Sequence, residues 1–371
     1  MRIGVPTETR SGELRIAATA ETIKKLVAAG HECLVEAGAG SSASQTDDMM
    51  VAAGAKIVNS SEALGAQVVL KVRAPNEQEL SHMQSGATLI GMLNPFDKPC
   101  LETLTKAGIT AFALEAAPRT TRAQSMDVLS SQANIAGYKA VMVAANVYGR
   151  FMPMLMTAAG TVKAARVVIL GVGVAGLQAI ATAKRLGAVI EASDVRPPVK
   201  EQVESLGGKF IDVPFETDEE REIGKGSGGY ARAMPESWMK RQAIAVALRV
   251  AQADIVISTA LIPGRKAPIL ITEDMVKSMK PGSVIIDMAV EQGGNCPLSE
   301  LGKTVVKHGV HIVGEANLAG LVPADASALY ARNVLDFFKL IVDKENNLHI
   351  DLEDDIVKAC LMCRSGELLR A

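Results

Sequence analysis

The chain has 371 residues, a length typical of two or three domains, with 22% charged residues and a formal net charge of -2. This balance excludes a strong electrostatic attraction to nucleic acid or to anionic lipid. Aromatic residues make up only 3% of the chain, which argues against a surface that stacks single-stranded bases.

The first third of the chain alternates short apolar runs with helical patterns. The residues after Met1 lack a hydrophobic leader and predict a first strand. Thr19 is expected to cap a helix that ends at Ala29, and Ser60 or Ser61 to cap a short helix. Such alternation predicts a parallel sheet with helices on both faces. Its expected strands are Arg2–Val5, Glu32–Val35, Val68–Val72, Thr88–Gly91 and Thr110–Ala113.

A polar segment from Pro118 to Tyr138 follows, dense in side chains that hydrogen-bond an amide or orient a charge. It leads into a predicted helix over Asn134–Val147 that would bridge two domains. A cleft between two α/β domains is where a nicotinamide ring would lie. A polar linker that merely caps the helix explains the same residues, and the sequence alone favours neither reading.

The glycine-rich turn after a β-branched run is the most specific motif. Gly171 permits a tight turn, Gly173 lets a diphosphate approach the backbone, and Gly176 lets the following helix (Leu177–Leu186) pack closely. Asp194 lies 18 residues beyond Gly176, at the end of the next expected strand. Its carboxylate would accept hydrogen bonds from an adenosine ribose and repel a 2′-phosphate, which predicts NAD(H) over NADP(H). The alternative is a glycine-rich turn in another kind of α/β sheet.

The rest of the chain continues a second parallel sheet and then a C-terminal helix. The longest uncharged run, Val167–Ala183, is too short to span a membrane. Thr217–Trp238, rich in charge and glycine, is expected to be a mobile surface loop, passive or acting as a lid. A helix over Ala326–Val342 and a polar, hairpin-like tail are expected to return to the first domain. The expected strands of this sheet are Arg166–Leu170, Val189–Ser193, Ile255–Ser258, Val284–Asp287 and His311–Val313.

These patterns predict an α/β protein with two Rossmann-like, doubly wound parallel-sheet domains separated by a cleft. One domain would comprise residues 1–133 plus 320–371, and the NAD(H)-binding domain residues 134–319 with a mobile loop at about 217–238. Five cysteines are scattered along the chain. Cys360 and Cys363 form a C-x-x-C without a second pair, so ordinary thiols in a reducing cytoplasm are expected and no metal site.

Several long segments make the chain recognisable. It resembles the NAD(H)-binding component (domain I, belonging to the alpha subunit) of the proton-translocating NAD(P) transhydrogenase family, which is related to alanine dehydrogenase. The segments that carry this resemblance are Arg119–Tyr138, 156–162, Gly171–Gly176, 200–208, 259–264 and 287–296.

The resemblance implies roles for residues in both domains. It implies that the polar segment surrounds the nicotinamide and its ribose, with Arg119, Gln124, Asp127 and Ser130 presenting the ring for hydride transfer. The other implied contacts in this segment are Thr120, Thr121, Ser125 and Met126. The contacts implied elsewhere are Gly171, Gly173, Val174, Ala175, Gly176, Asp194, Val195, Arg196, Gly229, Tyr230, Gln242 and Leu261. With Gly229 and Tyr230 included, the lid reading of the loop overtakes the passive one, although its acidic stretch differs from some relatives.

The related alanine dehydrogenases are the main alternative. Their keto-acid ligands are matched by Arg15 and Lys71, and an aspartate by Glu291, but their catalytic histidine is replaced by Asn94. An amide neither takes up nor releases a proton at neutral pH, and amino-acid oxidation needs a general base. Hydride transfer between two nicotinamides needs positioning only. A second alternative is a non-enzymatic NAD sensor or scaffold.

The resemblance also implies partners. It implies a homodimer that works with an NADP(H)-binding domain and an integral membrane proton channel, and no nucleic acid. The chain would then be a natural subunit or an excised fragment, peripheral to the membrane on the cytoplasmic or matrix side.

Overall fold

The computed structural model describes residues 1–196, 198–224 and 234–370. The chain forms two compact units, Met1–Gln132 with Ala319–Ala371, and Ala133–Leu318. Helix α6 (Val128–Val147) begins in the first unit and ends in the second. Within the described residues, no helix combines the length and the hydropathy that crossing a bilayer requires.

The first unit is built on an eight-stranded sheet in the order β17-β16-β6-β5-β4-β1-β2-β3. The six strands from β3 to β6 are parallel; β16 joins antiparallel to β6, and β17 pairs antiparallel with β16. The strands are β1 (Arg2–Val5), β2 (Glu32–Glu36), β3 (Lys56–Val58), β4 (Val68–Arg73), β5 (Thr88–Met92), β6 (Thr110–Ala113), β16 (Leu361–Arg364) and β17 (Glu367–Leu368).

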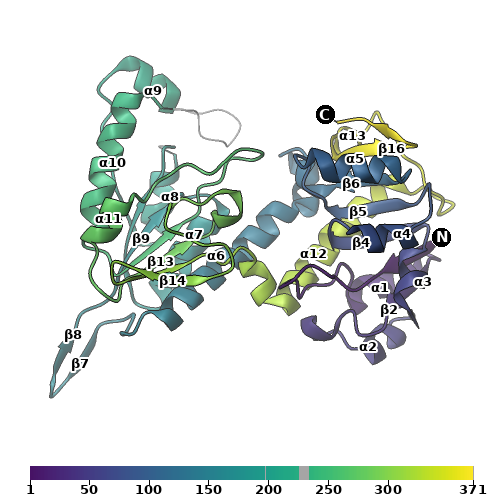
Figure 1. Cartoon of the computed structure of the whole chain (residues 1–371), viewed down its shortest axis with the longest axis horizontal. Helices are drawn as coiled ribbons and strands as arrows, with labels where there is room; N and C mark the ends of the chain where they lie inside the picture. Colours follow the sequence, from purple (N-terminus) through teal and green to yellow (C-terminus); the bar gives the residue numbers. More distant parts are fainter. Residues whose placement is uncertain (197, 225–233, 371) are drawn as a thin grey trace. The chain divides into compact units, whose positions relative to one another are not determined.

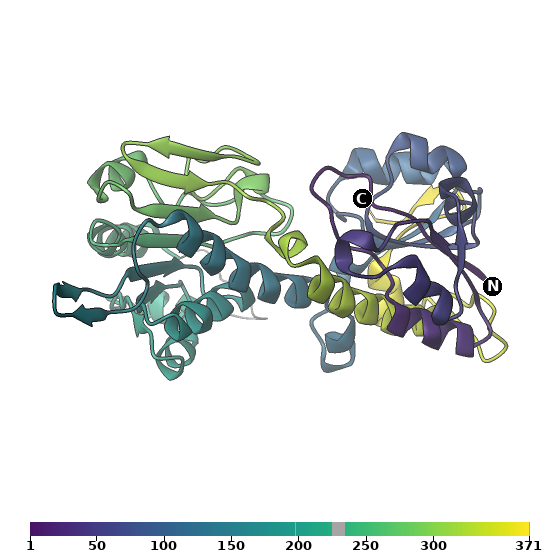
Figure 2. The same ribbon diagram turned by 90° about the horizontal axis from the view of Figure 1, so that it is seen from below.

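Helices cover both faces of this sheet, because alternate residues of each strand enter two separate cores. Val68 and Leu70 belong to the core that α1 and α12 cover, whereas Val69 belongs to the other core. Figure 2 shows the yellow-green α12 beside the purple α1. The helices are α1 (Ala20–Ala28), α2 (Asp47–Ala52), α3 (Ser60–Leu64), α4 (Glu77–His82), α5 (Lys98–Lys106), α12 (Pro323–Phe338) and α13 (Asp355–Cys360).

The second unit repeats the plan with seven strands in the order β11-β10-β9-β12-β13-β15-β14. All pairs are parallel except β14 with β15. In Figure 1, α10 and α11 lie on one side of this sheet and α6 and α7 on the other. The strands are β9 (Arg166–Leu170), β10 (Val189–Ser193), β11 (Lys209–Phe210), β12 (Ile255–Ser258), β13 (Val284–Asp287), β14 (Thr304–Lys307) and β15 (Val310–Val313); the helices are α7 (Val174–Arg185), α8 (Val199–Ser205), α9 (Asp218–Gly224), α10 (Glu236–Val250) and α11 (Glu273–Ser278).

A two-stranded antiparallel hairpin, β7 (Leu155–Thr157) and β8 (Gly160–Val162), projects from the body of the second unit (Figure 1). Its apolar side chains are exposed, with Met156 at 70% and Met154 at 61%. An isolated hairpin has no core of its own and is marginal in water.

The predicted α/β class with two Rossmann-like parallel sheets is confirmed, since six strands in each sheet follow the order 3-2-1-4-5-6 of that fold. The predicted strands all form, but the short edge strands β3, β11 and β14 were not predicted. The β3 and β11 strands have only three and two residues, too few to show a repeating pattern, and none of the four residues of β14 is fully buried.

Several element boundaries were wrong. Asn59, not Ser60 or Ser61, caps α3, because its side chain accepts the N–H of Glu62. Helix α6 begins at Val128, six residues before the expected Asn134, because Asp127 caps it. Helix α12 ends at Phe338 and a 3-10 turn, Lys339–Ile341, replaces the expected last turn.

The expected loop over Thr217–Trp238 is also corrected. Asp218–Gly224 form helix α9, and Trp238 is buried in the first turn of α10. Helix α9 has three acidic residues in its first turn, which stabilise it through their interaction with the helix dipole. Residues 225–233, which include Gly229 and Tyr230, lie outside the described residues.

Candidate functional site

The glycine turn of the second unit has the geometry that a diphosphate requires. Gly171 follows β9 with φ 93°, a left-handed conformation that favours glycine. A Cβ on Gly176 would lie 2.0 Å from the Gly171 carbonyl oxygen, whereas a Cβ on Gly173 would meet nothing within 4 Å. The absence of a side chain at Gly176 therefore permits close packing, and its absence at Gly173 leaves open space in front of the backbone.

Helix α7 begins in this turn with Val174 and Ala175, and no side chain caps its N-terminus. Its first N–H groups and the positive end of its dipole therefore remain available to an anion. Thr259 braces the turn by donating its hydroxyl to the Gly171 carbonyl at 2.9 Å. The residues present thus fit the diphosphate of a dinucleotide.

Asp194 lies at the carboxyl end of β10, where the sequence places it. One of its oxygens accepts the Val172 N–H at 2.7 Å, the other accepts the Arg196 N–H at 2.9 Å, and the Arg196 guanidinium pairs with the carboxylate at 2.8 Å. The carboxylate thus joins the glycine turn to the loop after β10. A ribose would compete with Arg196 for it.

Two further predicted residues lie at the same end of the sheet. Gln242 of α10 is buried and donates to the Ser193 hydroxyl at 3.2 Å, beside Asp194. Val195 packs against an apolar cluster that contains Trp238. The structure therefore brings Gly171–Gly176, Asp194–Arg196 and Gln242 together at the carboxyl ends of β9 and β10.

Leu261 lies in the exposed loop after β12 and is itself 45% exposed. The amide of Asn295 holds this loop by donating to the carbonyls of Ala260 at 2.9 Å and Pro268 at 2.8 Å. Asn295 is in turn placed by the buried Asp287, which accepts its N–H at 3.1 Å. The sequence offered Asp287 to Cys296 only as a matching segment, so this support was missed.

The polar segment of the first unit forms a 3-10 helix over Thr121–Met126 and then the start of α6. Met126 is buried, whereas the other predicted contacts before Asp127 are exposed: Arg119, Thr120, Thr121, Gln124 and Ser125. Their exposure leaves these side chains accessible to a ligand.

Asp127 caps α6. Its carboxylate accepts the Ser130 N–H at 2.8 Å and the Ser130 hydroxyl at 2.6 Å. The capping role considered for this segment is therefore present, and it fixes two predicted site residues against each other.

Elements from the far end of the chain hold this segment in place, and the sequence did not predict them. Asn333 of α12 contacts Ser125 and Ser131, and the Arg122 guanidinium pairs with Asp354 at 2.6 Å and with Asp355 at the N-terminus of α13. These residues are more than 200 positions apart in sequence, so no local pattern shows the contact.

Arg15 and Lys71, which match keto-acid ligands of alanine dehydrogenase, are buried in ion pairs. The Arg15 guanidinium lies 2.6 Å from Glu13, and the Lys71 ammonium lies 2.6 Å from Glu79 and 3.4 Å from Glu8. Burial raises the pKa of the Glu8 carboxyl despite the nearby Lys71. Both cations are thus already neutralised by carboxylates of the chain.

Asn94 lies in the loop between β5 and α5 in a left-handed conformation, φ 54°. Its N–H donates to the Glu115 carboxylate at 2.9 Å. Burial raises the pKa of Glu115, whose oxygens are both occupied by backbone N–H groups.

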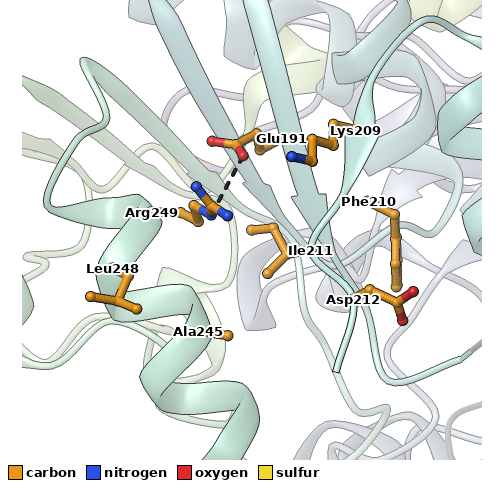
Figure 3. Close-up of a pocket in the computed structure, with 8 residues that line it drawn as sticks. All are labelled: Glu191, Lys209, Phe210, Ile211, Asp212, Ala245, Leu248 and Arg249. Carbon is orange, nitrogen blue, oxygen red and sulfur yellow. Dashed lines mark ion pairs between the residues drawn. The ribbon is translucent and has the colours of Figure 1, made fainter. Parts of the chain in front are cut away.

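Figure 3 shows a cavity of about 260 Å³ on the α10 side of β10 and β11. Its ion pair joins Glu191 to Arg249, whose Nε lies 3.5 Å away. Among the described residues, no predicted site residue lines the cavity, and its two acidic and two basic side chains balance in charge. It is lined by Glu191, Lys209, Phe210, Ile211, Asp212, Ala245, Leu248 and Arg249.

The two cysteines of the C-x-x-C motif are buried thiols without a disulfide. Burial raises the pKa of the Cys360 thiol to about 12, so it stays protonated at neutral pH. This environment is typical of an unreactive cysteine.

Two family models match the chain. The alanine dehydrogenase/PNT N-terminal domain matches residues 4–136 and the alanine dehydrogenase/PNT C-terminal domain matches residues 140–371. The C-terminal match includes α12 and the tail, although these fold into the first unit.

Curated relatives and solved structures agree with these matches. The first part of NAD(P) transhydrogenase subunit alpha of Rhodospirillum rubrum is 54% identical to this chain, over 100% of this chain and 98% of the relative. Alanine dehydrogenase of Mycolicibacterium smegmatis is 30% identical over 93% of this chain and 88% of the relative. A crystal structure of transhydrogenase from Sinorhizobium meliloti is 47% identical with a TM-score of 0.90, covering 99% of this chain and 100% of that one.

Proposed function

We propose that this chain, which belongs to the alanine dehydrogenase/PNT family, is the NAD(H)-binding subunit of a proton-translocating transhydrogenase. The observation that carries this choice within the family is Asn94. The related alanine dehydrogenases resemble this chain around β5 but have a catalytic histidine there, and an amide cannot replace it as a base. Arg15 and Lys71, with Glu13 and Glu79 already bound to them, support the same choice.

When bound, NADH would supply a hydride from its C4–H bond to C4 of NADP⁺ on a partner, so that NADH is oxidised, NADP⁺ is reduced and no proton enters the step. This chain would bind and orient the donor. Alignment of two reactants contributes about 7–11 kcal/mol to such a step, so positioning alone accounts for most of the catalysis.

The proposed division of labour assigns the adenosine diphosphate to the second unit. The open backbone at Gly173 and the uncapped α7 would bind the diphosphate. Asp194 would hold the adenosine ribose once Arg196 moves aside, and would disfavour a 2′-phosphate, which gives NAD(H) and not NADP(H). Gly229 and Tyr230 would cover the cofactor as part of a lid.

The nicotinamide and its ribose are assigned to the polar segment of the first unit. The exposed Arg119 and Gln124 would hydrogen-bond the carboxamide or the ribose. Asp127 and Ser130, already fixed against each other, would set the height of the ring above the segment.

The proposed partners are a second copy of the chain, an NADP(H)-binding domain and a membrane proton channel. The exposed hairpin β7–β8 supports the homodimer. Burial of Met156, and of Met154 just before β7, by a second copy of the chain would stabilise the association. The chain would be peripheral to the membrane, on the cytoplasmic or matrix side.

The test mixes the purified chain with the NADP(H)-binding component of a transhydrogenase, NADH and NADP⁺. Formation of NADPH that needs both proteins is expected. In a parallel reaction the chain alone receives alanine and NAD⁺. Appreciable NADH there, with no exchange in the mixture, would establish the alanine dehydrogenase reading and reject the proposal.

A further inference from the structure

One side chain of α12, Asn333, contacts the polar segment on both sides of Asp127 and Ser130, two of its predicted nicotinamide contacts. We propose that Asn333 is a positioning residue for hydride transfer, which it would influence by fixing the turn between the 3-10 helix and α6. This inference rests on the proposed function, because it concerns how the same segment is held.

The contacts of Asn333 are short and partly buried. Its amide nitrogen donates to the Ser125 carbonyl at 2.7 Å, and its amide oxygen accepts the Ser131 hydroxyl at 2.7 Å. Asn333 is 8% exposed, so water does not replace these bonds freely. One side chain therefore spans the seven residues from Ser125 to Ser131.

The stretch between these two contacts carries Asp127 and Ser130. Its Asp127 carboxylate accepts both the N–H and the hydroxyl of Ser130. The internal bonds fix Asp127 and Ser130 relative to each other, and the buried Met126 and Val128 pack the stretch against the core of the first unit. The clamp by Asn333 adds the directional polar restraint that apolar packing lacks.

Helix α12 is itself firmly placed, which makes it a suitable support. The Tyr330 hydroxyl donates to the Lys71 carbonyl at 2.7 Å, and the Ser327 hydroxyl accepts the Ile16 N–H at 3.0 Å. Gln132 adds a bond to the Ala326 carbonyl at 3.1 Å. A site is held accurately when its supporting residues lie on a rigid element.

The chemistry of the amide explains why asparagine suits this position. The Ser125 carbonyl needs a donor and the Ser131 hydroxyl needs an acceptor, and a primary amide offers both at once. Alanine at 333 would leave the Ser125 carbonyl and the Ser131 hydroxyl without these partners. The turn would then be free to shift, and a displacement of about 1 Å costs about 10²-fold in rate.

The experiment compares the full chain with Asn333→Ala and Ser131→Ala in single-turnover exchange with the NADP(H)-binding component. At a temperature well below each melting point, Asn333→Ala is expected to transfer hydride at least about tenfold more slowly, with the dissociation constant of NADH changed by less than about twofold. Ser131→Ala removes one of the two contacts of Asn333, together with the bonds of the Ser131 hydroxyl to the Val128 carbonyl and the Gln132 amide. Its rate is expected to lie between those of the unchanged chain and Asn333→Ala. The matched control is Arg332→Gln on the same helix, whose exposed guanidinium pairs with Glu21.

Three outcomes would overturn the inference. Transfer at the unchanged rate by both variants would remove the clamp from the mechanism. A fall in rate matched by an equal loss of folded protein or of NADH binding would reduce Asn333 to a structural residue. If Asn333→Ala does not fold, Ser131→Ala decides between these results. Absence of exchange by the unchanged chain would instead reject the proposed function, and this inference with it.

Discussion

The glycine turn of the second unit and the polar segment of the first unit differ in what holds them. The turn is held by the close packing of Gly176 on the Gly171 carbonyl five residues earlier, and by bonds to Asp194 and Thr259 at the ends of the two strands that flank β9. The polar segment depends on Asn333 and Asp354, more than 200 positions away. A substitution in the turn acts locally on packing, whereas the geometry of the segment changes when a distant helix changes.

The largest effect is expected from Gly176→Val. Because its Cβ would lie 2.0 Å from a backbone oxygen, α7 must move away from β9. We expect the free energy of unfolding to fall by about 3 kcal/mol, with NADH affinity lowered about 100-fold or more. Urea unfolding and direct titration with NADH measure the two effects.

Gly173→Ala is the matched control for that variant. Nothing lies within 4 Å of the new methyl group, so stability should change by less than about 0.5 kcal/mol. The methyl group would nevertheless occupy the space proposed for the diphosphate, and NADH affinity should fall about tenfold, or about 1.4 kcal/mol. Unchanged affinity would show that no diphosphate approaches this turn.

Gln124→Ala addresses the other region. The side chain is exposed, so its loss should leave stability unchanged within about 0.5 kcal/mol. Hydride transfer is expected to slow about tenfold or more, while NADH binding changes little because the adenosine half anchors the cofactor. Gln78→Ala, an exposed glutamine in α4, serves as the control. Loss of NADH binding by Gln124→Ala would contradict a positioning role.

The two regions also differ in how far the sequence predicted them. Gly171, Gly176 and Asp194 follow from local rules, because a strand, a turn and a helix follow one another directly in the sequence. The contact of Thr259 with the Gly171 carbonyl joins positions 88 residues apart and was not predicted. The early start of α6 was missed because capping was considered for the polar segment as a whole and not assigned to Asp127. Its capping of Ser130 became clear in the structure.

Contacts across the chain account for most of what the sequence could not provide. Nothing near Asn333 indicates that its amide bonds Ser125, and nothing near Asp354 indicates that it pairs with Arg122. Arg15 and Glu13 are only two residues apart in the sequence, but the burial of both side chains follows only from the tertiary fold. Hydrophobic periodicity reports which face of an element is buried and not what it touches.

Asp194→Asn tests nucleotide choice with a moderate effect. Loss of the charge removes the ion pair with Arg196 and the repulsion of a 2′-phosphate. The preference for NADH over NADPH is expected to fall about tenfold, or about 1.4 kcal/mol, in direct titrations of both nucleotides. Asp212→Asn, at an exposed pair with Lys200 in the same unit, is the control. An unchanged preference would remove Asp194 from the ribose site.

The smallest effect is expected from Arg122→Gln, at the exposed end of the polar segment. The Arg122 guanidinium lowers the pKa of the Asp354 carboxyl from 3.8 to about 2, so the pair stabilises the fold above about pH 4 and loses that effect as the pH falls towards 2. The unchanged chain should have a higher free energy of unfolding in urea than Arg122→Gln. This difference should be constant from about pH 7 to pH 5 and become smaller below pH 5. The control repeats the comparison in a chain that carries Asp354→Asn and so has no carboxyl at position 354 to titrate. There the effect of Arg122→Gln on the free energy of unfolding should not become smaller below about pH 5.

Hydride transfer provides a second measurement on Arg122→Gln. Since Asn333 still holds the segment, the rate should fall by less than about twofold, because an exposed pair contributes little. A larger fall would mean that the exposed bridge, and not the buried amide, determines where the segment lies.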